Sequence, residues 1–122
     1  MTIKGLGTDI LKVSRFEKVL KKHSTRFLKR LFSSEETDYC NQYKDRVQHL
    51  AGRFSAKEAV SKALGCGFGK KLSFQDIIIE NNTEGKPVVR FSKRVIEQFN
   101  NPQIEVSISH CVEYTTATAV WS

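Results

Sequence analysis

Glu58 and Lys62 are the residues of this 122-residue chain whose types and spacing most readily suggest chemistry. They lie four residues apart in a segment typical of a helix, so they share a face one turn apart. Val47, Ala51 and Phe54 fall on the same stripe, and a carboxylate there is costly to bury unless a cation compensates it. The alternative is a solvent-facing ion pair, worth only a few tenths of a kcal/mol. The helix alone leaves both interpretations open.

Asp9 is a second acid that could take part. It follows Gly5 and Gly7 at the end of a strand predicted over residues 3–10, a position that suits a metal ligand and also the start of a helix. Two separated carboxylates and a nearby lysine offer the hard oxygen ligands typical of Mg²⁺, which leaves room for substrate phosphates. No Cys and His set has zinc-site spacing. The residues therefore favour a Mg²⁺-dependent reaction on a phosphate or diphosphate.

The chain's net charge of +7 is concentrated in one segment. Residues 12–30 hold eight bases and one acid, so they account for the whole excess. Arg15, Lys18, Lys22, Arg26 and Lys29 form one helical stripe, while Val13, Phe16, Leu20, Phe27 and Leu31 form an apolar stripe on another face. A solvated surface is the ordinary explanation, but a face of almost one sign favours an acidic partner. Nucleic acid, an anionic membrane surface and an acidic protein all remain possible partners.

The expected elements predict one α+β domain over residues 1–122, with helices packed on a small antiparallel sheet. The basic helix is expected to begin at Ser14, with Glu17 completing a capping box, and to break at residues 23–25. A second helix should begin at Ser33 or Ser34, and the longest should run over residues 45–64 and end at Gly65. The remaining elements are strands over residues 76–80, 87–91, 104–110 and 114–121, and a short helix over 92–99.

The composition indicates a cytoplasmic protein. Three cysteines, Cys40, Cys66 and Cys111, are an odd number without zinc-site spacing, which favours a reducing compartment. No apolar run approaches the roughly 20 residues of a membrane span. No N-terminal segment has the pattern of a secretion signal.

Three motifs resemble those of one known family. They are Gly5-Leu6-Gly7-Thr8-Asp9-Ile10, the stretch from Arg53 to Gly65, and Val106-Ser107-Ile108-Ser109-His110. In order and spacing they resemble the holo-[acyl-carrier-protein] synthases, the short bacterial class of 4′-phosphopantetheinyl transferases. The resemblance covers essentially the whole chain. It implies the fold of that family, a homotrimer with coenzyme sites between subunits, and transfer of the 4′-phosphopantetheine arm of coenzyme A to a serine of apo acyl carrier protein in fatty acid biosynthesis.

The resemblance also implies roles for individual residues. Asp9 and Glu58 match acids that bind Mg²⁺, and Glu58 and Lys62 are the expected catalytic residues. Glu58, directly or through a water, is the preferred acceptor of the serine proton. The residues expected to bind coenzyme A are Lys44, Arg53, Lys62, Gly65, Gly67, Gly85, Pro87, Ser109 and His110. The basic face formed by Arg15, Lys18, Lys22 and Arg26 suits docking of the acidic carrier protein.

Two positions depart from the family pattern. Many relatives carry an acid where this chain has Lys12, and some carry a base where it has Asp45. Two other functions compete with the transferase: a small nucleic-acid-binding module and a non-catalytic domain that binds a carrier protein. The first is disfavoured because Phe16 and Phe27 lie on the apolar face and are not interleaved with the bases. We expect neither nucleic acid nor a membrane as partner.

Overall fold

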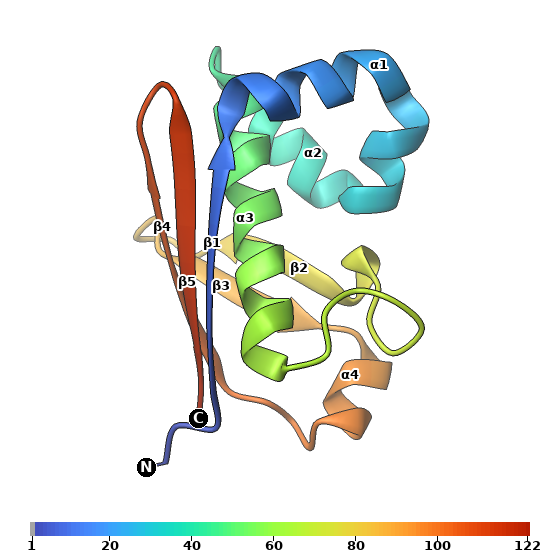
Figure 1. The fold of residues 1–122 in the computed structure, drawn as a ribbon, viewed down its shortest axis with the longest axis vertical. Helices are drawn as coiled ribbons and strands as arrows, with labels where there is room; N and C mark the ends of the chain where they lie inside the picture. The colour runs from blue at the N-terminus through green and yellow to red at the C-terminus, as the bar shows by residue number, and fades with distance from the viewer. Residues whose placement is uncertain (1) are drawn as a thin grey trace.

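The computed structural model describes residues 2–122, and of Ser24 only the backbone. The larger sheet is antiparallel, with strand order β1-β5-β4 (Figure 1). A hairpin of β2 and β3 forms the second sheet. The strands are β1 (Gly5–Lys12), β2 (Ile77–Asn81), β3 (Pro87–Phe91), β4 (Ile104–His110) and β5 (Tyr114–Trp121). The helices are α1 (Val13–Leu31), α2 (Ser34–Asn41), α3 (Arg46–Leu64) and α4 (Lys93–Gln98), with a 3₁₀ turn η1 at Phe74–Asp76.

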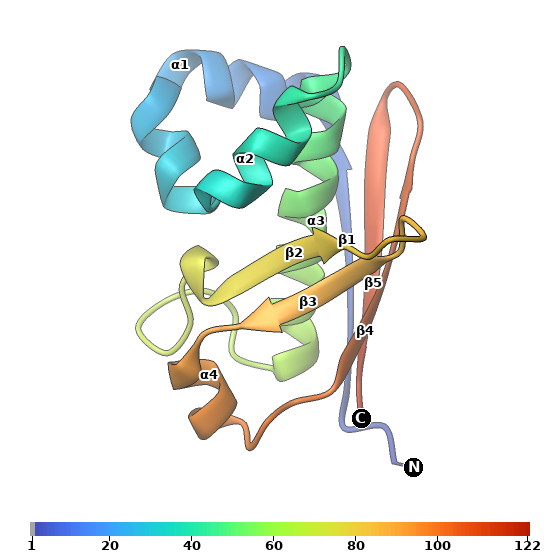
Figure 2. The ribbon, with the colours of Figure 1, turned by 180° about the vertical axis from the view of Figure 1, so that it is seen from behind.

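Helix α3 lies at the centre of the fold. It runs alongside the larger sheet in Figure 1, and Figure 2 shows the β2–β3 hairpin crossing another side of it. Helices α1 and α2 pack on its N-terminal half through a cluster that includes Phe16, Leu20 and Leu50. Its C-terminal half, including Val60 and Leu64, packs with both sheets and α4. A helix with apolar residues on several sides is expected in such a central position.

A buried ion pair joins α2 to α3. The Lys57 ammonium donates to Glu36 Oε1 at 2.8 Å and to the carbonyl oxygens of Leu31 and Phe74 at 2.7 and 3.1 Å. The Glu36 carboxylate also accepts from the backbone amides of Ser33 and Ile79, both at 2.9 Å. Burial lowers the pKa of Lys57, and the charge of Glu36 opposes that shift. Because each charge has an opposite partner and further hydrogen bonds, the pair can be buried in the interior.

Most of the predicted elements are confirmed. Helix α2 begins after Ser33, which forms a capping box with Glu36, and α3 is followed by Gly65 as its C-cap, with a φ of 81°. The β2–β3 and β4–β5 hairpins and the helix after Ser92 also form. None of the described helices is long and apolar enough to cross a membrane.

The predicted start and break of the basic helix are wrong. Helix α1 begins at Val13 after Lys12, with no side-chain cap and therefore no capping box from Ser14 and Glu17, and it continues through residues 23–25. The amide of Val13 instead donates to the carbonyl of Glu113 at 2.9 Å, in the β4–β5 turn. The strand over residues 3–10 is also shifted, since β1 runs from Gly5 to Lys12. Asp9 is consequently inside the strand, and neither ends it nor starts a helix.

Candidate active site

Two glycines bring β1 into direct contact with α3. A Cβ added to Gly5 would lie 1.9 Å from the carbonyl oxygen of Ala63, and one added to Gly7 would lie 1.9 Å from that of Ala59. Only hydrogen fits at such distances. Because alternate residues of a strand share a face, Asp9 is the next residue after these glycines to face α3. The glycines therefore determine how closely the Asp9 carboxylate approaches the helix.

Asp9, Glu58 and Lys62 form a charged cluster where β1 meets α3. The Lys62 ammonium donates to the carbonyl of Thr8 at 2.8 Å and lies 3.5 Å from Asp9 Oδ1. The Asp9 side chain is 15% exposed and that of Lys62 is 52% exposed. Lys62 is thus a partner of Asp9 across the two elements, and the helical Glu58–Lys62 pair considered from the sequence does not form as an ion pair among the described residues. Thr8, Asp9 and Lys62 line an open hollow of about 380 Å³ with Thr116 and Thr118 of β5.

Glu58 is the half-buried member of this cluster. Burial raises the pKa of its carboxyl, the charge of Asp9 raises it further, and Lys62 opposes both. A half-buried carboxyl whose ionisation is disfavoured by burial and by a neighbouring acid forms a place where a further cation is stabilising. Among residues 2–122, no group of three or more His, Cys, Asp and Glu side chains could enclose a metal. The carboxylates of Asp9 and Glu58 fit a hard cation that takes its remaining ligands from water and substrate oxygens.

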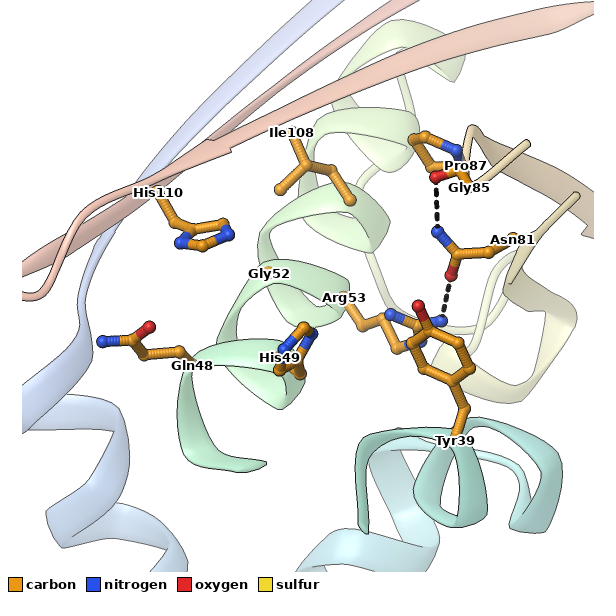
Figure 3. A pocket seen from close by; sticks show the side chains of 10 residues that line it. All are labelled: Tyr39, Gln48, His49, Gly52, Arg53, Asn81, Gly85, Pro87, Ile108 and His110. Atoms are coloured by element: carbon orange, nitrogen blue, oxygen red, sulfur yellow. Dashed lines mark hydrogen bonds between the residues drawn. The ribbon is translucent and has the colours of Figure 1, made fainter. Parts of the chain in front are cut away.

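A second pocket, of about 250 Å³, lies between α2, α3, β4 and the β2–β3 hairpin (Figure 3). Its lining includes the positively charged side chain of Arg53, a residue that is only 5% exposed. The Arg53 guanidinium lies 4.2 Å from the centre of the Tyr39 ring, and its Nη2 donates to Asn81 Oδ1 at 2.5 Å. The pocket is lined by Tyr39, Gln48, His49, Gly52, Arg53, Asn81, Gly85, Pro87, Ile108 and His110.

The electrostatics of this pocket favour an anion. Arg53 Nε is buried and has no hydrogen-bond partner among the described residues. His49 and His110 stand nearby, with ring centres 6.3 Å apart. The pKa of His49 is lowered, chiefly by burial, and the charge of Asp45, 3.3 Å from its Nε2, opposes that shift. A buried guanidinium that forms no ion pair among the described residues favours a phosphate or carboxylate group in this pocket.

The structure distributes the predicted coenzyme-binding residues over several places. Arg53, Gly85, Pro87 and His110 line the second pocket, whereas Lys62 belongs to the cluster with Asp9. Lys44 lines a neighbouring hollow of about 350 Å³ that shares Gln48 with the second pocket. Ser109 precedes His110 and therefore faces the opposite side of the sheet. Gly65 and Gly67 lie in the loop after α3, both with positive φ. Within one chain, the second pocket and the hollow beside Asp9 therefore share no lining residue.

Sequence reasoning missed several residues of the second pocket, among them Tyr39, His49 and Asn81. His49 could have been found, because it precedes Arg53 by one helical turn. Tyr39 and Asn81 come from α2 and β2, and only the packing of those elements on α3 brings them to Arg53. No local pattern marks either residue.

The basic face of α1 lies at the surface as predicted. Arg15, Lys18, Lys22 and Arg26 are exposed, while Val13, Phe16, Leu20 and Leu31 are buried. Near the end of this face, Val19, His23, Arg26, Phe27 and Arg30 surround a hollow of about 300 Å³. The helix therefore offers positive charge next to a partly apolar depression.

Fold and site together define an α+β protein with an acidic cluster beside a lysine and a pocket around a buried arginine. The family model of the 4′-phosphopantetheinyl transferase superfamily matches residues 5–119. The chain therefore belongs to this superfamily, and the resemblance of its three motifs is confirmed.

Similar proteins agree with this assignment over nearly the whole chain. The chain is 48% identical to the holo-[acyl-carrier-protein] synthase of Protochlamydia amoebophila, over 97% of each sequence. Its fold matches the Helicobacter pylori holo-[acyl-carrier-protein] synthase, crystallised in complex with coenzyme A, with a TM-score of 0.88 and 40% identity over 96% of this chain and 99% of that one. The Neisseria meningitidis synthase matches with a TM-score of 0.91 and 31% identity over 99% of both chains. The expected fold class is thereby confirmed.

Proposed function

We propose that this chain, with residues 1–122 acting as one unit, transfers the 4′-phosphopantetheine arm of coenzyme A to a serine of apo acyl carrier protein, in fatty acid biosynthesis in the cytoplasm. The observation that carries the proposal is the cluster of Asp9, Glu58 and Lys62 held by the glycine-mediated contact of β1 with α3. In the reaction the serine oxygen forms a bond to the β-phosphorus of the coenzyme, and the bond from that phosphorus to the bridging oxygen breaks. Adenosine 3′,5′-bisphosphate leaves.

Asp9 and Glu58 would hold a Mg²⁺ ion, since they supply the oxygen ligands this metal prefers. When bound, the ion would neutralise the charge of the diphosphate. Lys62, with its exposed ammonium beside Asp9, adds a positive charge toward the same group. Glu58 takes the proton of the serine hydroxyl, because a carboxyl whose pKa is raised by burial is a better base than an ordinary one.

The nucleotide end of coenzyme A occupies the second pocket. Arg53 and His110 face its phosphates, and Gly85 and Pro87 line its edge. From the resemblance to the family, we infer that the active protein is a homotrimer in which each site combines the cluster of one subunit with the pocket of its neighbour. In support, the pocket and the hollow beside Asp9 share no lining residue within one chain. Lys44, Gly65, Gly67 and Ser109 complete the coenzyme site in this arrangement. The outer face of the larger sheet is uncovered, with Leu6 62% and Ile10 68% exposed, which suits a contact between subunits.

The carrier protein docks on the basic face of α1. Acyl carrier proteins are acidic, and Arg15, Lys18, Lys22 and Arg26 present complementary charge without an ion-pair partner among the described residues. Charge complementarity of this kind raises the association rate and orients the partner.

Mass spectrometry tests the function directly. Apo acyl carrier protein is incubated with coenzyme A, Mg²⁺ and the purified chain, and the phosphopantetheine mass increment is expected on the acceptor serine. A carrier variant with that serine replaced by alanine serves as control and should stay unmodified. Failure of the wild-type carrier to gain the increment would refute the proposal.

A further inference from the structure

Asn81 makes two hydrogen bonds that join opposite sides of the second pocket. Its side-chain oxygen accepts from Arg53 Nη2 at 2.5 Å, and its side-chain nitrogen donates to the carbonyl oxygen of Gly85 at 3.0 Å. Figure 3 shows both bonds in line, from α3 through Asn81 to the loop between β2 and β3. Asn81 is the last residue of β2 and pairs with Pro87, so the backbone ladder holds it in this position.

The chemistry of the amide group explains why an asparagine suits this position. An amide offers both an acceptor and donors, whereas a carboxylate cannot donate to Gly85 and an apolar side chain can do neither. The Arg53 guanidinium donates a hydrogen bond to the Asn81 side chain. The guanidinium also lies over the face of the Tyr39 ring, 4.2 Å from the ring centre. Stacking alone would leave the guanidinium free to rotate in its own plane. The bond to Asn81 removes that freedom.

The neighbouring Asn82 has a different task and makes a matched comparison possible. Its side-chain oxygen accepts from the amides of Glu84 and Lys86 at 3.0 and 2.9 Å, so it closes the loop internally. It makes no hydrogen bond to Arg53 among the described residues. Two consecutive asparagines therefore hold the same loop, and one of them also holds the arginine.

We propose that Asn81 is a positioning residue for the coenzyme's nucleotide: it fixes the orientation of the Arg53 guanidinium in the lining of the pocket, and it fixes the Gly85 loop against that group. The proposal rests on the function proposed above only for the identity of the ligand. Its effect is exerted through Arg53, so replacing Asn81 should have no consequence for the nucleotide once Arg53 is gone.

Calorimetric titration with adenosine 3′,5′-bisphosphate tests this coupling. The proteins compared are the wild type, Asn81→Ala, Asn82→Ala, Arg53→Ala and the double variant Arg53→Ala/Asn81→Ala. We expect Asn81→Ala to weaken binding about tenfold, the effect of losing a hydrogen bond that orients a charged group, and Asn82→Ala to change it less than about threefold. In the Arg53→Ala background, Asn81→Ala should add no further loss.

Steady-state kinetics provide a readout that a general loss of structure would not reproduce. Asn81→Ala should raise the KM for coenzyme A by a similar factor while leaving kcat and the KM for the carrier protein nearly unchanged. Thermal unfolding checks that Asn81→Ala is folded. If it is not, Asn81→Ser takes its place in the same measurements, since the serine hydroxyl reaches neither partner. Unchanged nucleotide affinity of the folded variant, or an equal loss with and without Arg53, overturns the proposal. No binding of the bisphosphate by the wild type would instead overturn the proposed function.

Discussion

Lys57 and Glu58 are neighbours in the chain and face different environments. Lys57 points into the interior, where its ammonium is fully bonded, and Glu58 points to the cluster with Asp9. One residue therefore stabilises the helix in its place, and the other carries a charge that is unfavourable until a cation compensates it. The same motif serves stability and chemistry through adjacent side chains.

Replacing Glu58 by Gln should abolish most of the transfer activity and stabilise the metal-free protein. We expect activity to fall by a hundredfold or more, about 3 kcal/mol of transition-state stabilisation, because metal and base functions are both lost. Since the folded-state pKa of Glu58 is raised, its ionised form destabilises the fold at neutral pH. That cost disappears as the pH falls below the raised pKa to the ordinary glutamate value of about 4.3.

The measurement is thermal unfolding of Glu58→Gln and the wild type in EDTA across this pH range. The melting temperature of the variant should exceed that of the wild type near pH 7, with the difference shrinking toward about pH 4. Near-normal transfer by the variant, or a lower melting temperature at neutral pH, would refute this account of Glu58.

Replacing Lys57 by Met should destabilise the fold by about 3–5 kcal/mol, because it leaves the Glu36 carboxylate buried without its positive partner. Urea unfolding measures the difference. Lys93→Met, at an exposed position of α4, is the control and should lie within about 0.5 kcal/mol of the wild type. Equal unfolding midpoints for the two variants would show that the buried pair contributes nothing.

At the scale of elements, the contact between β1 and α3 decides where Asp9 stands. A methyl group at Gly7 would overlap the carbonyl oxygen of Ala59, and neither backbone can move without disturbing the sheet or the helix. Gly7→Ala should therefore cost about 1–3 kcal/mol or more, and should reduce transfer by moving Asp9 away from Glu58. Gly69→Ala is the matched control, since a Cβ at Gly69 meets nothing within 4 Å. The prediction fails if both variants melt at the wild-type temperature.

The basic face of α1 should control the encounter with the carrier protein and little else. Reversing Lys18, Lys22 and Arg26 to glutamate should raise the KM for apo carrier protein by tenfold or more at low salt, with the affinity for coenzyme A unchanged. The difference from the wild type should shrink as salt screens the charges. Lys93→Glu, on α4, changes the net charge without touching this face. A similar rise in KM for that control would show that overall charge, and not this helix, attracts the carrier.

At the scale of the whole molecule, a site shared between subunits predicts complementation. Glu58→Gln and Arg53→Ala should each be nearly inactive alone, yet mixed trimers should regain activity because about a quarter of the sites then combine two intact halves. Activity is measured after co-expression, and light scattering reports the number of subunits. Glu58→Gln mixed with Asp9→Asn is the control that should not recover, since both changes lie in the same cluster. Absence of recovery in the first mixture would mean that each site belongs to one chain.

Much of the fold can be predicted from local signals in the sequence, whereas the candidate site can be predicted only in part. Ser33, Gly65 and the two hairpins were predictable because caps, left-handed glycines and alternation act over a few residues. The start of α1 was not, because the bond from Val13 to Glu113 connects segments far apart in the chain. The same holds for Asn81 and Tyr39, which reach Arg53 only after three elements have packed. The pairing of Lys62 with Asp9 could not be predicted either, because it depends on the position of β1 against α3.

The direct passage of β1 into α1 has one more consequence. Asp9 and the first helical residue, Val13, are four positions apart, and no linker separates strand from helix. Four residues of a strand span about 13 Å. A partner bound to the helix is then held at a fixed distance from the carboxylates, because the backbone between them is continuous. Substitutions on the helix surface can change which partner is accepted while that distance, and with it the reach required of the incoming serine, stays the same.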